Sequence, residues 1–131
     1  MRSSLLMPPE TRTLTAEEYL LAKHQFEVGG RSLAAELEEV PCHVLLLDVR
    51  DAAAHAKSHI RGALSMPERG LSAKVPTLPR DKRVVVYGWD GDCELALKAA
   101  MTLAKRGFEV RLLTGGLEEW ERRGMPLEAK R

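Results

Sequence analysis

The residues best placed for chemistry lie in a short loop, residues 88–93, with the sequence Gly-Trp-Asp-Gly-Asp-Cys. The loop joins an apolar run typical of a buried strand to a segment typical of a helix. Backbone N–H groups of such a loop point inward, and the helix N-terminus adds about half a positive charge, so the pattern predicts an anion-binding cradle. A cysteine in this cradle would be a nucleophile. The most central position belongs to the first loop residue, which here is Gly88.

Cys93 ends this loop and begins the predicted helix, which favours reactivity. Three carboxylates surround it, those of Asp90, Asp92 and Glu94, and no Lys or Arg occurs between residues 88 and 97. Each carboxylate opposes an incoming anion by roughly 0.7 kcal/mol at about 6 Å in water, against a helix-end attraction of only ~0.3–1 kcal/mol. We therefore expect a dianionic substrate to bind poorly. Cys93 is either a relocated nucleophile or an ordinary small residue, and its side chain is expected at the rim of the loop.

The other cysteine, Cys42, precedes the apolar run at residues 44–49, whereas Cys93 follows a strand. In a parallel sheet these positions lie at opposite edges, separated by about 17 Å for a strand of five residues. A disulfide requires Cα atoms within roughly 7 Å, so we predict that the two cysteines do not pair. Two such cysteines fit a reducing compartment. Because the sequence has no signal peptide and no apolar run near the ~20 residues of a membrane span, we expect a cytoplasmic protein.

Two further groups of polar residues could do chemistry. Asp48 and Arg50 follow a predicted strand, and we expect Asp48 to accept backbone N–H groups while Arg50 forms a fixed ion pair. His55 and His59 are four residues apart, as a helical pair of metal ligands would be, but no third ligand stands at a recognisable spacing. We therefore expect no metal, and we expect Asp48, Arg50 and His59 to support the site.

Composition limits the classes of partner. The 131 residues include 20 Lys and Arg against 19 Asp and Glu, which gives a net charge of +1. That balance provides no field that would attract nucleic acid or an anionic membrane. With 44% hydrophobic and 30% charged residues, a chain of this length is typical of one globular domain.

Strands and helices alternate along the chain, after residues 1–12, which we expect to form a flexible arm. The hydrophobic pattern predicts strands at residues 44–49, 62–66, 84–87 and 109–113. It predicts helices after Thr15 as far as Gly29, from Ser32 to Pro41, at residues 52–57 and 93–106, and through Trp120, with an irregular segment at 67–79. This order indicates an α/β fold with a mostly parallel sheet. Its carboxyl edge should gather four groups: Arg50 and Asp51, the residues after Met66, residues 88–93 and residues 114–116.

Four motifs occur in an order and spacing that resemble a known family: Asp48-Val-Arg50, His59-Ile-Arg-Gly-Ala63, Val84-Val-Val-Tyr87 with the glycine after it, and Gly115-Gly-Leu-Glu-Glu-Trp120. From about Leu33 to Pro126 the chain is similar to a single-domain rhodanese, of the thiosulfate sulfurtransferase superfamily. The segment before Gly29 resembles the helical extension of one bacterial branch. The resemblance implies a rhodanese-like three-layer α/β domain over residues 13–127, with helices flanking a central, mostly parallel sheet, and no cofactor.

The resemblance places a persulfide-bearing cysteine at the first loop position, which in this chain is Gly88. Cys93 matches the last loop position, where the family has Arg or, in the bacterial branch, a second cysteine. Gly91 matches the usual loop glycine, and His59 matches a histidine that locks a turn. Trp89 is expected to pack against the loop, to cover the pocket or to anchor a partner. The expected nucleophile is therefore missing.

Three interpretations follow from this departure. The first is a rhodanese-like protein that lacks standard thiosulfate sulfurtransferase activity and acts as a binding or regulatory module, or is a degenerate homologue. The second is an active sulfurtransferase that forms a persulfide on Cys93, with the loop amides holding the substrate and Arg50 supplying positive charge. The third, a phosphatase or arsenate reductase of the same fold, is disfavoured by the short loop and by Gly88. Expected partners at the loop edge are a sulfur donor or acceptor, or a protein, but neither nucleic acid nor a membrane.

Overall fold

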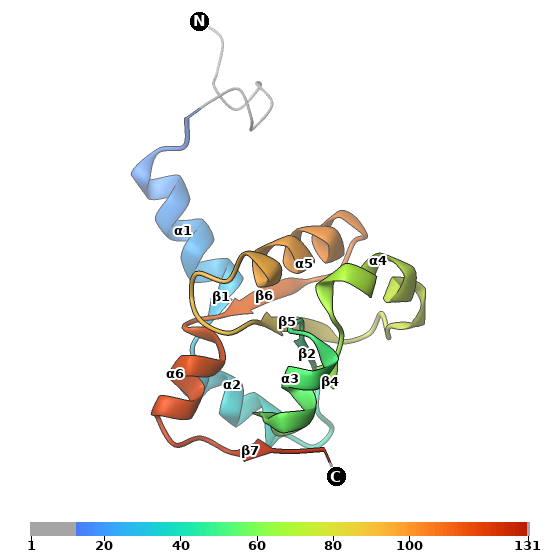
Figure 1. Cartoon of the computed structure of the whole chain (residues 1–131). Coiled ribbons are helices and arrows are strands. Elements are labelled where there is room, and N and C mark those ends of the chain that lie inside the picture. Colours follow the sequence, from blue (N-terminus) through green and yellow to red (C-terminus); the bar gives the residue numbers. More distant parts are fainter. Residues whose placement is uncertain (1–12, 131) are drawn as a thin grey trace, which may run out of the picture.

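The computed structural model describes residues 13–130, so the arm predicted for residues 1–12 lies outside the described residues. A five-stranded sheet forms the centre, with strand order β1-β6-β5-β2-β4 and every neighbouring pair parallel. Its strands are β1 (Glu27–Val28), β2 (Val44–Asp48), β4 (Leu64–Ser65), β5 (Arg83–Tyr87) and β6 (Val110–Leu113). The predicted α/β class with a parallel central sheet is confirmed (Figure 1).

Helices flank this sheet, and a small second sheet closes the lower end of the molecule in Figure 1. The helices are α1 (Ala16–Phe26), α2 (Gly30–Leu37), α3 (Ala52–Lys57), α4 (Leu71–Lys74), α5 (Glu94–Lys105) and α6 (Gly116–Arg122). Two short 3₁₀ helices, η3 (Glu68–Gly70) and η4 (Val75–Thr77), precede and follow α4. The second sheet pairs β3 (His59–Ile60) with β7 (Leu127–Glu128) in antiparallel register.

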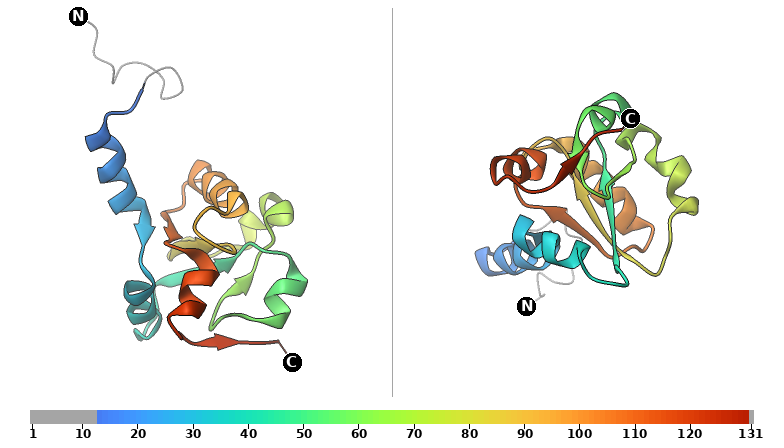
Figure 2. Two further views of the ribbon diagram at one scale, coloured as in Figure 1. Left: turned by 60° about the vertical axis from the view of Figure 1, so that its left-hand side comes forward. Right: turned by 90° about the horizontal axis from the view of Figure 1, so that it is seen from below.

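The core has two halves, one on each face of the central sheet. On one face, buried residues of β2 and β5 pack against α4 and α5, whose inward positions Ala96, Ala99 and Leu103 recur at helical spacing. On the other face, residues of the same strands pack against α2, β3 and α6, with Trp120 at the centre. Because β2 and β5 are covered on both faces, their central positions are continuous runs of Val and Leu, residues 44–47 and 84–86. The result is three layers, helix, sheet and helix (Figure 2).

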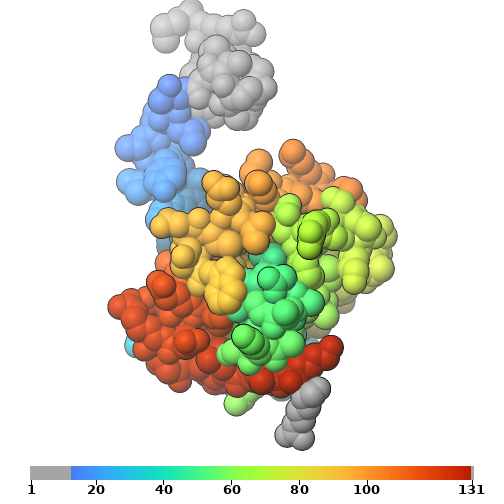
Figure 3. Space-filling view, in the orientation of Figure 1, coloured from blue at the N-terminus to red at the C-terminus, as the bar shows by residue number. Residues whose placement is uncertain are grey.

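Helix α1 stands apart from this core, as Figures 1 and 3 show. It begins with the predicted capping box, in which the Thr15 hydroxyl accepts from the N–H of Glu18 and the Glu18 carboxylate accepts from the N–H of Thr15. It contains no buried residue. The segment that follows it pairs as β1 with β6, so only the C-terminal end of α1 is held against the sheet.

Several predicted element boundaries were wrong. Helix α2 begins after Gly29 and ends at Leu37, so Ser32 lies inside the helix and does not cap it. The segment 67–79, predicted to be irregular, consists largely of η3, α4 and η4. The pattern also missed β1 and the β3–β7 pair, because two-residue strands have no measurable periodicity. Within residues 13–130 no helix has the length and hydropathy needed to cross a bilayer.

Candidate active site

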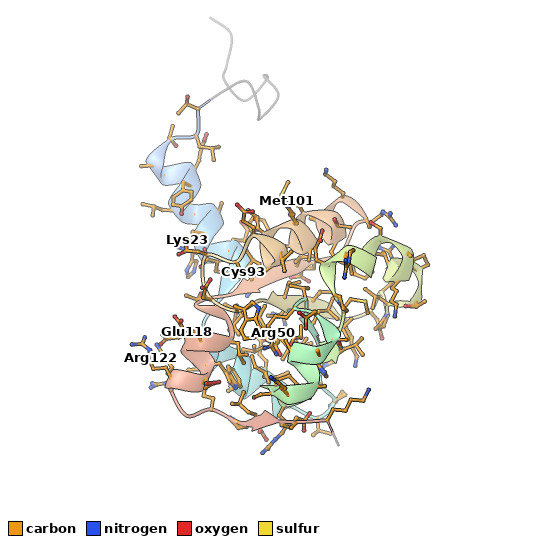
Figure 4. The ribbon with its side chains drawn as sticks, viewed as in Figure 1. Lys23, Arg50, Cys93, Met101, Glu118 and Arg122 are labelled. Carbon is orange, nitrogen blue, oxygen red and sulfur yellow. The ribbon has the colours of Figure 1, made fainter. Side chains whose placement is uncertain are left out.

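A cavity of about 430 Å³ lies at the carboxyl edge of β5 and β6, as predicted for a parallel sheet. Its wall comes from the C-terminal end of α1, from the loop 88–93, from the start of α5 and from the end of β6. The lining includes Lys23, Glu27, Gly88, Asp90, Asp92, Cys93, Glu94 and Thr114. Figure 4 shows Lys23 and Cys93 on the same side of the molecule, and Figure 3 shows the loop surface between α1 and α6.

Cys93 fills the space that a side chain at position 88 would need. An ideal Cβ built on Gly88 would overlap the Sγ of Cys93 and would lie 2.8 Å from its Cβ and 3.5 Å from the Cβ of Ala96. The expectation that the Cys93 side chain leaves from the rim of the loop is therefore wrong. Cys93 is the N-cap of α5 and its thiol turns back toward the first loop residue, where glycine leaves room for it.

The loop is braced from outside by α6. The N–H groups of Leu117 and Glu118 donate to the carbonyls of Gly88 and Trp89 over 3.0 and 2.8 Å. Gly116 lies directly against the loop, and a Cβ there would approach the backbone N and O of Asp90 to 2.8 Å. Its positive φ of 59° and this close approach both require glycine. The backbone of residues 88–90 is thus held by contacts that involve no loop side chain.

Asp90 occupies part of the predicted anion cradle. Its Oδ1 accepts a hydrogen bond from the N–H of Asp92 over 2.9 Å, and its carbonyl accepts from the N–H of Cys93 over 3.4 Å. Two of the amides expected to face a bound anion are therefore engaged within the loop. The cradle predicted from the sequence is incomplete for this reason.

The cavity brings one cation to the loop that the sequence reasoning missed. Lys23, from the far end of the chain, lines the same cavity as Cys93. Its Nζ donates to the Glu27 carboxylate over 2.7 Å, and this hydrogen bond and charge raise the pKa of Lys23 above its ordinary value. Glu27 also accepts from the Thr114 hydroxyl over 3.3 Å. One lysine thus faces four carboxylates, those of Glu27, Asp90, Asp92 and Glu94.

Asp48 and Arg50 form a buried ion pair, as predicted. The guanidinium donates to both carboxylate oxygens, from Nε over 3.0 Å and from Nη2 over 2.7 Å, and the Arg50 N–H also donates to Oδ1. Burial opposes the charged guanidinium, but the hydrogen bond and charge of Asp48 raise the pKa of Arg50 above its usual value. Trp89 stacks over the guanidinium with its ring centroid 4.5 Å away.

The guanidinium of Arg50 is paired with Asp48 and lies outside the cavity lining. Arg50 is only 2% exposed and does not line the cavity that contains Cys93. The role that the second interpretation gives to Arg50, to lend positive charge to a substrate, therefore finds no contact in this cavity and stays a prediction. Trp89 itself is 54% exposed, and it covers Arg50 and not the cavity, which it does not line.

His59 belongs to β3 and does not line the cavity that contains Cys93. Its Nδ1 is 2.6 Å from the carbonyl of His55, and its Nε2 is 3.4 Å from the Glu128 carboxylate of β7. The rings of His55 and His59 stack 3.6 Å apart, and His55 Nε2 is 2.9 Å from the Ala63 carbonyl. Among residues 13–130, no three His, Cys, Asp or Glu side chains are arranged to hold a metal ion.

Cys42 lies at the opposite edge of the sheet, where the sequence placed it. Both cysteines are free thiols, which confirms the prediction that they do not pair. The Cys42 thiol lies 3.6 Å from the Val44 carbonyl and 3.7 Å from the Glu36 carbonyl, beside a separate cavity of about 230 Å³. Cys93 is therefore the one cysteine of the chain at the carboxyl edge.

Comparison with known proteins places this chain in a family. Residues 31–123 match the model of the rhodanese-like domain. A protein named sulfurtransferase from Allochromatium vinosum is 32% identical over 104 residues, which is 79% of this chain and 94% of that protein. The HTH-type transcriptional regulator Rv0324 of Mycobacterium tuberculosis is 32% identical over 85 residues, but the match spans only 38% of that regulator.

Solved structures agree with these sequence matches. The BH2092 protein from Bacillus halodurans superposes with a TM-score of 0.80 and 30% identity, over 87% of this chain and 84% of that one. Its three-layer arrangement is thus shared with the chain described here over nearly the whole length. Because the family model covers most of the sequence, the chain belongs to the family of rhodanese-like domain proteins.

Proposed function

We propose that the protein is a sulfurtransferase that accepts sulfane sulfur on Cys93 and does not use thiosulfate efficiently. One observation carries the proposal: the Cys93 thiol occupies the space beside Gly88 that the side chain of the first loop residue would fill. The thiol is thus near the centre of the loop, although its residue is the last of the loop. The named sulfurtransferase among the relatives supports the same class of chemistry.

The reaction is a transfer between two thiols. The Cys93 thiolate attacks the outer sulfur of a donor persulfide, R–S–SH, and a new S–S bond forms on Cys93 as the S–S bond of the donor breaks. The donor thiol, R–SH, leaves with the proton that Cys93 gave up. The four carboxylates of the cavity oppose this step less when the donor carries less negative charge.

Thiosulfate is a poor donor for such a site. It carries two negative charges, and the one cation in the cavity, Lys23, is already paired with Glu27. The Asp92 and Cys93 amides are engaged by Asp90. Fewer backbone N–H groups are therefore free to bind an anion than in a usual anion cradle. The negative charges of the lining also repel a dianion.

A second candidate function is a binding or regulatory module without chemistry. Two features favour it: Gly88 stands where the resemblance to the family places the nucleophile, and the loop carries negative charge. A relative of which the match is only one part is named a transcriptional regulator, so related segments occur within proteins of that class. In this candidate Cys93 is a packing residue and the cavity binds a partner.

Intact mass separates the two candidates. The protein is incubated with a small persulfide donor or with thiosulfate, and the gain of one sulfur atom is measured for the wild type, Cys93→Ser and Cys42→Ser. We expect a sulfur adduct from the persulfide in the wild type and in Cys42→Ser, none in Cys93→Ser, and slow thiocyanate release when cyanide is added. If neither donor gives a sulfur adduct that depends on Cys93, the sulfurtransferase proposal is wrong and the binding-module candidate is favoured.

A second variant tests the position of the thiol. Gly88→Ala keeps Cys93 but adds a Cβ where its Sγ lies, so the thiol must turn away. We expect the rate of sulfur acceptance to fall by about 10²-fold, because displacing a reacting group by about 1 Å typically lowers the rate of an enzyme by that factor. Gly70→Ala is the matched control, because a Cβ there meets nothing within 4 Å. Equal rates in Gly88→Ala and Gly70→Ala would contradict the proposed geometry.

A further inference from the structure

We infer that the cavity selects a donor persulfide whose carbon skeleton carries an ammonium group, an aminothiol persulfide, over anionic donors. This inference presupposes the persulfide chemistry proposed for Cys93 and adds its substrate class. The observations are the volume of the cavity, the place of the thiol in its wall and the distribution of charge around it.

The charge around the thiol is negative and comes from separate elements. Asp90 and Asp92 belong to the loop, Glu94 begins α5, and Glu27 belongs to β1. Against these four carboxylates stands one Lys, which gives the lining a formal charge of −3. Carboxylates brought together from the loop, a helix and a strand surround whatever enters, so their fields add at the thiol.

Two of these carboxylates are free to bind a ligand. Within residues 13–130, the side chains of Asp92 and Glu94 have no hydrogen-bond or ion-pair partner, whereas Glu27 is held by Lys23 and Asp90 by the amide of Asp92. Asp92 immediately precedes Cys93 and Glu94 immediately follows it. Both residues are exposed and line the cavity, so an ammonium group beside either carboxylate would stay near a sulfur that reaches Cys93.

The cavity has room for a donor of this kind. Its volume of about 430 Å³ lies toward the small end of ligand sites in proteins. Lys23 of α1 lines the same cavity, and its charge is neutralised by the ion pair with Glu27. A donor with only negative charge finds no unpaired cation in the lining.

The bond changes in the selected reaction are those of a simple thiol transfer. Cys93 attacks the outer sulfur of the aminothiol persulfide, the S–S bond of the donor breaks, and the persulfide forms on Cys93. The free aminothiol leaves with the proton of the Cys93 thiol. The ammonium group takes no part in bond making. It increases the rate at which the donor associates with the cavity and helps to position the donor there.

The field at Cys93 is measured directly with charged thiol reagents. A methanethiosulfonate transfers its R–S group to the thiolate, forms a mixed disulfide and releases methanesulfinate. The rates with aminoethyl and sulfonatoethyl reagents are followed by mass in Cys42→Ser, and each is divided by the rate with a small free thiol. We expect the cationic reagent to be favoured by about ten-fold or more at low salt, and this ratio to approach one at high salt.

Variants locate the origin of that preference. Asp92→Asn with Glu94→Gln removes the two free carboxylates, and we expect the ratio to fall at least three-fold. Glu39→Gln with Glu109→Gln changes the net charge equally and lies outside the cavity lining, so it should leave the ratio unchanged. A ratio near one in the wild type, or an equal fall in both double variants, would overturn the inference.

The donor series then separates this inference from the proposed function. Persulfide formation on Cys93 is compared for aminoethyl persulfide and for a carboxylate-bearing alkyl persulfide of similar size. A preference of about ten-fold for the aminoethyl donor supports both the proposed persulfide chemistry and the selectivity for an ammonium-bearing donor. Equal rates with the two donors would leave Cys93 as the acceptor but overturn the selectivity, whereas no adduct with either would overturn the proposed function itself.

Discussion

The hydroxyl of Tyr87 donates a hydrogen bond to Asp48 Oδ2 over 2.7 Å and so ties the end of β5 to the end of β2. The hydroxyl oxygen of Tyr87 in turn accepts a hydrogen bond from the N–H of Ile60 over 3.1 Å. Burial, with the charge and hydrogen bond of Asp48, raises the pKa of Tyr87 well above its usual range, so the hydroxyl keeps its proton. Because Tyr87 immediately precedes Gly88, this bond fixes the point at which the loop leaves the sheet.

Tyr87→Phe should therefore lower the free energy of unfolding by about 1–3 kcal/mol, because it leaves the buried Ile60 amide without its acceptor. Urea denaturation of the two proteins measures the difference. Tyr19→Phe is the matched control, since Tyr19 is exposed on α1 and its change should cost less than about 0.5 kcal/mol. Equal stability of Tyr87→Phe and wild type would show that the hydroxyl does not hold the strand ends.

Arg50 and Trp89 should differ strongly in their effect on stability. Arg50→Ala leaves Asp48 buried without its charged partner, and such a change costs about 3–5 kcal/mol. Trp89→Ala removes a half-exposed ring that stacks on the guanidinium, and we expect a loss of about 0.5–1 kcal/mol. Chemical denaturation ranks the two variants. A larger loss for Trp89→Ala would mean that the ring, and not the ion pair, supports the loop.

Gly88→Cys should give a protein in which the two loop thiols pair. Its Cβ would start 2.8 Å from that of Cys93, so a shift of about 1 Å brings the pair to the 3.5–4.5 Å of a disulfide. Oxidised glutathione should convert both thiols to a disulfide, with loss of two hydrogen atoms by mass. Added Cys93→Ser should free the new thiol and restore weak thiocyanate formation from thiosulfate. Two free thiols after oxidation would contradict the contact between these positions.

Glu128 links β7 to β3 in a way that depends on pH. The N–H of Gly62, with a smaller contribution from His59, holds the pKa of Glu128 below its ordinary value. Its contribution to stability is therefore present above a pH of about 4.3, the value for glutamate in an unfolded chain, and is lost as the pH falls through the lowered pKa. Glu128→Gln should be less stable than wild type at neutral pH, and the difference should shrink in acid. Thermal midpoints across that range, with Glu39→Gln as control, measure it.

Local pattern was enough to predict the central elements. The run of Val and Leu in β2 and β5, and the recurrence of Ala96, Ala99 and Leu103 on α5, express burial directly in the sequence. The two-residue strands were not predictable in this way. His59 and Glu128 pair because the chain after α6 returns to form β7 beside β3. No local sequence pattern around either residue indicates this long-range contact.

The site was predictable in position but not in arrangement. The order of strands and helices placed residues 88–93 at the carboxyl edge, and a cavity lies there in the structure. The direction of the Cys93 side chain depends on the absence of a Cβ at Gly88, which a linear pattern does not convey. Lys23 was missed because the pairing of β1 with β6 brings the end of α1 to the loop.

Helix α1 combines two properties that seldom occur together. It has no residue in the core, and yet its last turns provide Lys23 and lead to Glu27 in the wall of the cavity. Substitutions along it cost little folding free energy, because none of its side chains is buried. Evolution can therefore vary the charge at the mouth of the cavity through α1 with few consequences for the rest of the molecule, so donor preference can diverge among relatives that keep the same sheet and the same thiol.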